Sequence, residues 1–163
     1  MPELSLTPVR PSRASVVRLM VPTDANFMGN VFGGEILSEV DRVAYIAATR
    51  HAKANCVTAS IDRVDFILPV HVGEVVEFEA QLTYVGHSSM EVWVRANSEA
   101  LAGGGPRLVG EAFVTMVALD PTGRPTPVPG LKLDTEDERR RFEQGKRRME
   151  ERKRTRVVAE RGH

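Results

Sequence analysis

Apolar residues recur along this chain with two different periods, and the change of period marks the predicted elements. From Gly34 to about His51 they recur every three or four positions, which predicts an amphipathic helix with one buried face. Later segments alternate with period two or are apolar throughout, which predicts strands at 56–68, 75–85, 90–97 and 108–119. A further strand is predicted at 15–21, and Pro22 ends it because proline cannot donate a hydrogen bond to a neighbouring strand.

The 56–68 segment changes phase in its middle. Apolar side chains occupy odd positions as far as Ile61 and even positions from Val64 onward. One extra residue near Asp62 and Arg63 accounts for the change, so we expect a β-bulge there.

One helix and five strands predict an α+β fold in which a curved antiparallel sheet wraps around the helix. The other face of the sheet carries Trp93, Phe113, Val117 and Leu119, more apolar area than a monomer normally leaves in water, so we expect a partner subunit. The domain covers residues 15–130 and ends in a proline-rich linker at 121–130. Residues 1–14 are predicted to be a loose arm, and residues 131–163 a charged helical tail that packs on a partner or on the fold surface.

Charge and composition narrow the class of protein. The formal net charge is zero, but residues 134–163 hold 11 Lys and Arg against 8 Asp and Glu. The rest of the chain is therefore acidic, which argues against a nucleic-acid partner. Cys56 is the lone cysteine, and no apolar run resembles a signal peptide or is long enough to span a membrane, so we expect a cytoplasmic protein with no membrane partner. The four histidines are scattered along the chain, so we expect no metal and no cofactor.

The long loop at 23–34 and the helix after it hold the candidate chemistry. Gly33 and Gly34 lie where the loop enters the helix, so a carbonyl oxygen could approach the free backbone N–H groups there, although a tight packed turn explains them as well. Asp41 lies two turns into the helix, on the flank of the apolar stripe, where a carboxylate can act as a base or a nucleophile. A solvated or ion-paired Asp41 is the structural alternative.

Four motifs carry a resemblance to a known family. The segments NFMGNVFGGEILSEVD (26–41), DRVDFILPVHVGE (62–74), VGHSSMEVWV (85–94) and the charged tail RRRFEQGKRRMEERKR (139–154) resemble the acyl-CoA thioesterase group of the hot-dog fold. That group includes the cytosolic or brain-type acyl-CoA hydrolases and short bacterial relatives. The resemblance implies acyl-CoA hydrolysis in dimers whose sheets join edge to edge, commonly assembled further into hexamers.

The resemblance also assigns roles to residues. Asn26 matches the active-site asparagine of the family, and in that family the asparagine of one subunit meets the aspartate of the other. Without the resemblance, an asparagine in this loop is typical of a turn. The loop of Gly86, His87, Ser88 and Ser89 is assigned to the coenzyme A arm, and an ordinary hairpin turn is the alternative. Four basic residues of the tail are candidates to bind the phosphates of coenzyme A: Arg147, Arg148, Lys153 and Arg154.

Some features leave other interpretations open. Thr58 and Ser60 share a strand face and could support the site, although an ordinary strand role is favoured. Met28 and Gly29 stand where bacterial relatives often have a second asparagine before the glycine, which leaves acyl positioning open. A hot-dog hydroxyacyl dehydratase and a non-catalytic acyl-CoA binding module are the alternative functions, and the first is disfavoured because the 23–34 loop contains no histidine.

Overall fold

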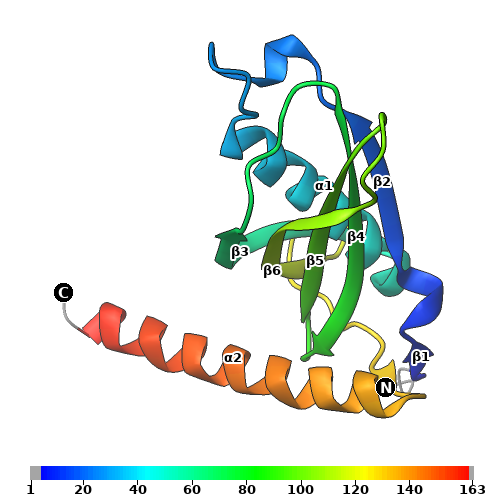
Figure 1. Cartoon of the computed structure of the whole chain (residues 1–163). Coiled ribbons are helices and arrows are strands. Elements are labelled where there is room, and N and C mark those ends of the chain that lie inside the picture. The colour runs from blue at the N-terminus through cyan, green and yellow to red at the C-terminus, as the bar shows by residue number, and fades with distance from the viewer. Residues whose placement is uncertain (1–4, 162–163) are drawn as a thin grey trace.

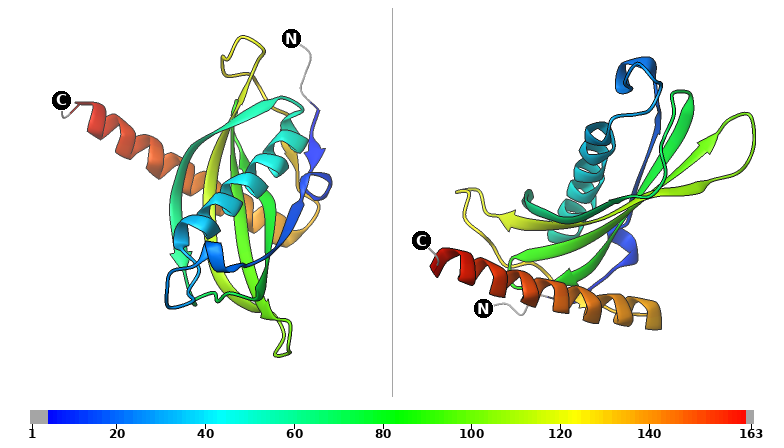
Figure 2. Two further views of the ribbon diagram at one scale, coloured as in Figure 1. Left: turned by 90° about the horizontal axis from the view of Figure 1, so that it is seen from above. Right: turned by 60° about the vertical axis from the view of Figure 1, so that its left-hand side comes forward.

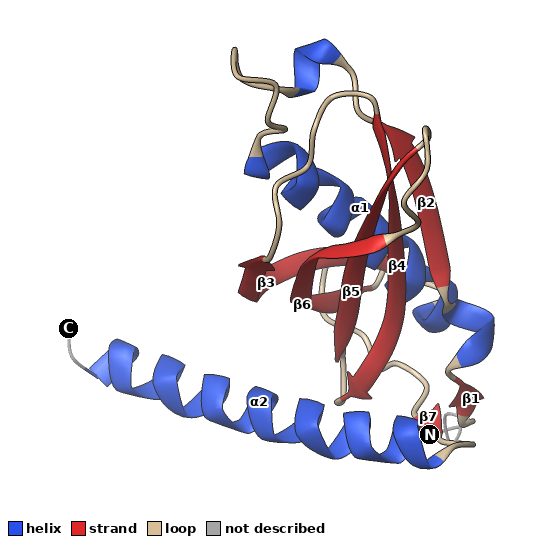
Figure 3. Ribbon diagram, in the orientation of Figure 1, coloured by secondary structure: helices blue, strands red, loops and turns tan. Residues whose placement is uncertain are grey.

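The computed structural model describes residues 5–161, and its main feature is a five-stranded antiparallel sheet with a long helix on each face (Figures 1 and 2). The sheet curves around α1, and α2 crosses the opposite face. Figure 3 shows the same elements coloured by type. In chain order they are β1 (Thr7–Pro8), the 3-10 turn η1 (Arg10–Ser12), β2 (Ala14–Leu19), the 3-10 turn η2 (Pro22–Asp24), α1 (Gly33–Ala52), β3 (Asn55–Phe66), β4 (Glu74–Val85), β5 (Ser89–Ala100), β6 (Arg107–Leu119), β7 (Leu131–Lys132) and α2 (Glu136–Arg161).

The five long strands lie in the order β2-β4-β5-β6-β3, and each neighbouring pair is antiparallel. The predicted hot-dog architecture is therefore confirmed, with one helix wrapped by one sheet and a charged helix after it. β3 occupies one edge of the sheet. Its outer edge has no strand beside it within the described residues, which leaves a row of backbone donors and acceptors open.

The core lies between α1 and the sheet. Val43, Ala44 and Ala47 on the predicted apolar stripe are fully buried, and they face inward-pointing sheet residues such as Phe78 and Met116. The small alanine side chains let the helix axis approach the sheet closely. The burial that results fixes which flank of α1 faces the edge strand β3.

The predicted bulge in β3 is confirmed. The pairing of β3 with β6 shifts register between Thr58 and Ser60 and again between Ile61 and Arg63. The second shift explains the change of phase after Ile61, because one extra residue turns the following side chains to the other face.

The outer face of the sheet is covered by α2, and the charged tail therefore packs on the fold surface of its own chain. Arg141 stacks over Trp93 at 4.1 Å, and Arg148 lies over the ring of Phe113 at 3.9 Å. Two of the four outer apolar residues are thus covered by α2 of the same chain, so the expectation of a partner subunit does not rest on them. The sequence signal was weak because arginines, rather than aliphatic side chains, form this contact.

A buried ion pair anchors α2 to the sheet. Arg148 donates two hydrogen bonds to Glu91, at 2.7 and 3.0 Å, and Glu91 also accepts from the Thr83 hydroxyl at 2.6 Å. Glu91 is only 2% exposed. At its start, α2 is capped reciprocally by Thr135 and Glu138, as in a capping box.

The predicted loose arm differs from the structure over residues 5–13. Thr7 and Pro8 pair in parallel with Leu131 and Lys132, and Val9 is buried. This contact joins segments more than 120 residues apart in sequence, so no local pattern signals it. Residues 1–4 of the predicted arm lie outside the described residues. No helix within residues 5–161 is long and apolar enough to cross a membrane.

We predict that Arg148→Met lowers the free energy of unfolding by about 2 kcal/mol, because it leaves the buried Glu91 carboxylate without its cation and Arg148 itself is partly exposed. Urea unfolding followed by circular dichroism measures the effect. Arg156→Met is the matched control, since Arg156 pairs with Glu160 in solvent. Equal stability of the two variants would contradict the anchoring role.

A second prediction concerns His51, at the end of α1. Its Nε2 lies 2.7 Å from the Pro129 carbonyl oxygen, and its buried Nδ1 has no partner among the described residues. Burial lowers the pKa of His51, and Lys53 lowers it further, against the opposing hydrogen bond to Pro129. Below a pH of about 6.5, His51 is protonated in the unfolded chain but remains neutral in the folded chain. The free energy of unfolding therefore falls as the pH decreases from about 6.5 to the pKa of His51 in the folded chain.

Replacing the imidazole should remove this part of the pH dependence. The unfolding free energy of wild type should therefore fall more steeply than that of His51→Gln as the pH decreases from 7.5 to 5. His87→Gln, at an exposed histidine, is the control. Parallel curves for wild type and His51→Gln would rule out His51 as a contributor.

Candidate active site

Asp41 lies on the flank of α1 that faces the edge strand β3. Its Oδ1 accepts a hydrogen bond of 2.5 Å from the Thr58 hydroxyl, and Thr58 also approaches the Met116 sulfur at 3.4 Å. Asp41 is half-buried, so one side of its carboxylate reaches solvent. The structure therefore gives Thr58 a contact with the candidate carboxylate, whereas the Ser60 hydroxyl donates to Asp62 instead.

An open cavity of about 660 Å³ adjoins this pair. Apart from Asp41 and Thr58, its walls are mostly apolar and come from α1 and the start of β3: Arg42, Tyr45, Ile46, Cys56 and Val57. Cys56 is buried, and this burial raises the pKa of its thiol. The thiol therefore stays protonated at neutral pH, which leaves Asp41 as the candidate base of the cavity.

Gly33 and Gly34 form the first turn of α1. Phe32 precedes the helix in extended conformation, and its carbonyl oxygen accepts the N–H groups of Glu35 at 3.0 Å and Ile36 at 3.5 Å. The N–H groups of Gly33 and Gly34 come before the first helical hydrogen bond, so helix geometry leaves them available to a ligand, with the positive end of the helix dipole behind them.

Gly33 lies close to the exposed ring of Phe66. A Cβ at this position would lie 3.1 Å from Cζ of Phe66, at the end of β3. The two residues also line a second cavity, of about 360 Å³, whose remaining walls are apolar: Val31, Ile36, Ile67, Leu68, Pro69, Val70 and Val109. A largely apolar space thus adjoins the helix start.

Asn26 shapes the loop before α1. Its Oδ1 accepts the N–H groups of Met28 at 3.0 Å and Asn30 at 3.2 Å, as the turn interpretation predicts. Within residues 5–161 no hydrogen bond uses its amide nitrogen, which remains able to donate. The loop in turn pairs with the segment before β4, where Val31 donates to the Val70 carbonyl at 2.8 Å.

The structure does not join Asn26 to Asp41 within one chain. α1 and β3 run in opposite directions, so Gly33 touches Phe66 at one end of β3 while Asp41 touches Thr58 near the other. The loop and helix start therefore form one half of the candidate chemistry, and Asp41 with Thr58 forms the other. The two halves lie at opposite ends of the open sheet edge.

The 86–89 loop is a tight hairpin. Gly86 donates to the Ser89 carbonyl, while the carbonyls of His87 and Ser88 accept from Val128 and Ala118. Ser89 also lines a groove of about 180 Å³ beneath the distal half of α2, together with Lys153 and Arg156. Lys153 thus lies near the predicted coenzyme A loop, whereas Arg148 is held by Glu91 and Arg147 and Arg154 are exposed.

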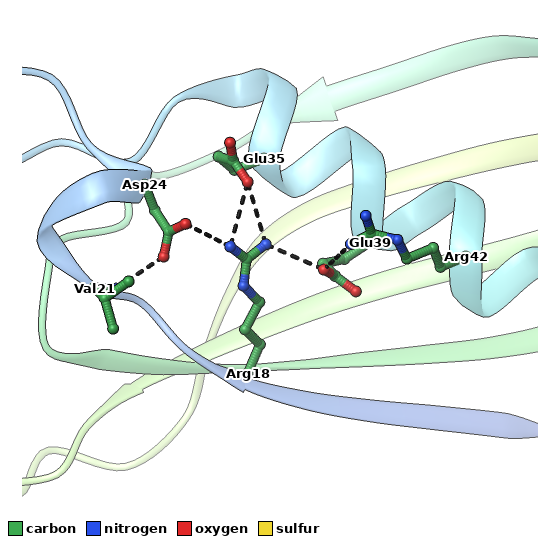
Figure 4. A network of polar contacts seen from close by, with 6 residues as sticks. All are labelled: Arg18, Val21, Asp24, Glu35, Glu39 and Arg42. Carbon is green, nitrogen blue, oxygen red and sulfur yellow. Dashed lines mark hydrogen bonds and ion pairs between the residues drawn. The ribbon is translucent and has the colours of Figure 1, made fainter.

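A network of charges at the start of α1 was missed in the sequence (Figure 4). Arg18 of β2 contacts Asp24 in the loop and both Glu35 and Glu39 on α1, and Arg42 adds a contact to Glu39 at 2.6 Å. One signal was present. Arg18 is the only charged residue of β2, and Glu35 and Glu39 are four residues apart on one side of the helix.

Comparison with known proteins identifies relatives of this chain. The family described as Thioesterase superfamily matches residues 28–101. An uncharacterized acyl-CoA thioester hydrolase of Bacillus subtilis is 44% identical over 117 residues, which cover 72% of this chain and 68% of that protein. The cytosolic acyl coenzyme A thioester hydrolase of the rat is 37% identical over 83% of this chain, but the chain spans only 36% of its length.

Solved structures share the whole fold. An apo-hexameric acyl-CoA thioesterase superposes with a TM-score of 0.88 at 43% identity, covering 93% of this chain and 97% of that one. The acyl-CoA hydrolase of Staphylococcus aureus, solved with butyryl coenzyme A and coenzyme A, gives 0.88 at 33% identity, with 96% and 95% covered. The fold is thus that of a hot-dog protein. This chain belongs to the thioesterase superfamily, in the acyl-CoA thioester hydrolase family.

Variants of the S. aureus hydrolase were also solved. In them alanine replaces an asparagine, an aspartate 15 residues further along, and a threonine 17 residues beyond the aspartate. Asn26, Asp41 and Thr58 repeat these residue types at the same spacing in this chain.

Proposed function

We propose that this chain hydrolyses fatty acyl-CoA thioesters to free acid and coenzyme A, at sites shared between two protomers. The observation that carries the proposal is the Asp41 carboxylate, held by Thr58 beside an open, mostly apolar cavity. Family membership supports the substrate class. The reaction uses water and requires no metal or cofactor. The lone buried cysteine and the cytosolic rat relative support a cytoplasmic location.

The open edge of β3 supports the shared site. Its neighbourhood exposes large apolar side chains, including Tyr45, Val57 and Phe66, and the Phe27 side chain in the loop is 100% exposed. Pairing β3 with the same strand of a second copy covers this surface and satisfies the open backbone groups. A two-fold pairing is antiparallel, so the Thr58 end of one strand meets the Phe66 end of the other.

This pairing brings the two half-sites together. Asp41 and Thr58 of one protomer then face Asn26 of the partner subunit, beside the helix start to which that loop leads. The hexameric thioesterase supports further assembly of such dimers into a trimer of dimers. Neither half holds both the basic group and the carbonyl-polarising groups, so a single protomer is expected to be inactive.

The proposed chemistry is addition of water to the thioester carbonyl. The N–H groups of Gly33 and Gly34, with the Asn26 amide, polarise the carbonyl and stabilise the oxyanion. Asp41 takes the proton of the attacking water, or attacks the carbon itself to form an anhydride that water then opens. In both routes the carbon–sulfur bond breaks and the coenzyme A thiolate takes up a proton. The Thr58 hydroxyl already donates a hydrogen bond to Oδ1 of Asp41, so Oδ2 of Asp41 is the oxygen that reacts.

The loop of Gly86, His87, Ser88 and Ser89, near the basic part of α2, is proposed to bind the coenzyme A arm. The loop offers hydroxyl groups, and Lys153 offers a cation in the adjoining groove. Arg148 is not proposed to bind the coenzyme A arm, because it already forms an ion pair with Glu91.

We predict that Asp41→Asn and Asn26→Ala each lower kcat for acyl-CoA hydrolysis by about 100-fold or more, because one removes the base and the other a carbonyl donor. Release of free thiol across acyl-CoAs of rising length measures the effect. Ser60→Ala is the control, since its hydroxyl serves Asp62. A wild-type rate in either variant would refute the assigned role, and stoichiometric binding without thiol release by wild type would favour the binding module.

Mixing the two inactive variants tests the shared site. In randomly assembled dimers half are mixed, and each mixed dimer contains one site with both intact residues, so about one quarter of wild-type activity should return. Unfolding and refolding the two variants together, followed by the thiol assay, provides the measurement. Each variant refolded alone gives the baseline. No recovery in dimers verified as mixed would mean that both residues act within one chain.

A further inference from the structure

Arg18 joins three elements around the start of α1 (Figure 4). Its Nη1 lies 3.1 Å from Glu39 Oε1 and 3.3 Å from Glu35 Oε2 on the helix, while its Nη2 contacts Asp24 Oδ1 at the start of the loop. The side chain of Arg18 comes from β2. One guanidinium thus connects the sheet, the Asn26 loop and the first two turns of α1.

On the loop side of this contact, two further hydrogen bonds hold Asp24 in place. The other Asp24 oxygen, Oδ2, accepts the Val21 N–H at 2.8 Å, and the Asp24 carbonyl accepts the Phe32 N–H at 3.0 Å. Asp24 therefore closes the loop at both ends. Asn26 lies two residues after Asp24, and Gly33 follows Phe32, so a shift of Asp24 would move both.

The charge balance at this point depends on Arg18. Asp24 and Glu39 are 4% and 6% exposed, and with Glu35 they form three carboxylates around one guanidinium. Burial acts to lower the pKa of Arg18, but the neighbouring carboxylates outweigh it and the pKa is raised. Without this cation, two buried carboxylates would repel each other, and only Arg42 would remain, on the Glu39 side.

Lysine cannot replace this arrangement. Two nitrogens of one planar guanidinium reach Asp24 on one side and Glu39 on the other, with Glu35 between them. A lysine ammonium would keep the charge but offers a single nitrogen, which cannot span the loop and the helix with the same geometry.

We propose that Arg18 is a positioning residue, which holds the Asn26 loop at a fixed distance from the helix start so that both polarise the same carbonyl. This rests on the proposed function for its kinetic consequence. Arg18 touches none of the assigned catalytic residues, so it acts through Asp24 and α1. Misplacement of carbonyl-polarising groups by about 1 Å can lower the rate about 100-fold, so loss of the Arg18 contact should be measurable as a lower kcat.

Hydrogen exchange tests the positioning directly on the full-length oligomer. In Arg18→Met we expect amides of residues 24–35, including that of Phe32, to exchange about ten-fold faster than in wild type, while the β4–β5 region is unchanged. Arg18→Lys should give an intermediate increase and guards against failure of the methionine variant to fold. Unchanged exchange at 24–35 in both variants would overturn the proposal, whatever the activity.

The kinetic arm separates positioning from binding. Arg18→Lys should lower kcat about ten-fold or more and change KM by less than about three-fold, because binding of the substrate arm does not involve Arg18. Arg95→Met is the matched control: Arg95 is a strand arginine paired with Glu79 at 2.8 Å on the opposite sheet face. Wild-type kcat in Arg18→Lys would overturn the proposal. Absence of thiol release by wild type would instead refute the proposed function, and the exchange result would still decide the role of Arg18.

Discussion

The opposed directions of α1 and β3 are the constraint on which the rest of the site depends. Because the helix packs along the edge strand, Asp41 is set against Thr58 while the helix start is set against Phe66 at the far end of the strand. One chain therefore carries the proposed base and the proposed carbonyl-binding groups at separate places. Antiparallel pairing of two such edges is the simplest arrangement that brings them together.

Buried charges fix the parts that surround this edge. Arg18 ties the Asn26 loop to α1, and Arg148 with Glu91 ties α2 across the outer sheet face. In each case an arginine satisfies carboxylates that lie almost wholly out of water, so removing the cation costs more than the pair itself contributes. The two clusters lie on opposite faces of the sheet. One stabilises the geometry of the site, and the other closes the apolar surface behind it.

Much of the fold could be predicted from the sequence, because α1 and the long strands show clear apolar periods and the bulge in β3 shows as a change of phase. Asp41 was also identifiable, as a carboxylate on the flank of an apolar stripe. The contact between Asp41 and Thr58 could not be derived in the same way, since it depends on how α1 sits over β3.

The coverage of the outer face was also beyond local patterns. The α2 helix has few apolar residues, and its anchor joins Glu91 to Arg148, 57 residues further along the chain. The pairing of Thr7 with Leu131 and the Arg18 network likewise depend on tertiary structure. In each of these cases the missing information was which distant charged or polar group would meet the residue.

The most direct measurement is an experimental structure of the assembled protein with a non-hydrolysable acyl-CoA analogue. Our account predicts that the analogue carbonyl lies between the Asp41 carboxylate of one protomer and Asn26 of the partner subunit, with its oxygen directed at the helix start. A carboxylate of residue 41 that points into bulk solvent, remote from residue 26 of every neighbouring protomer, would contradict it.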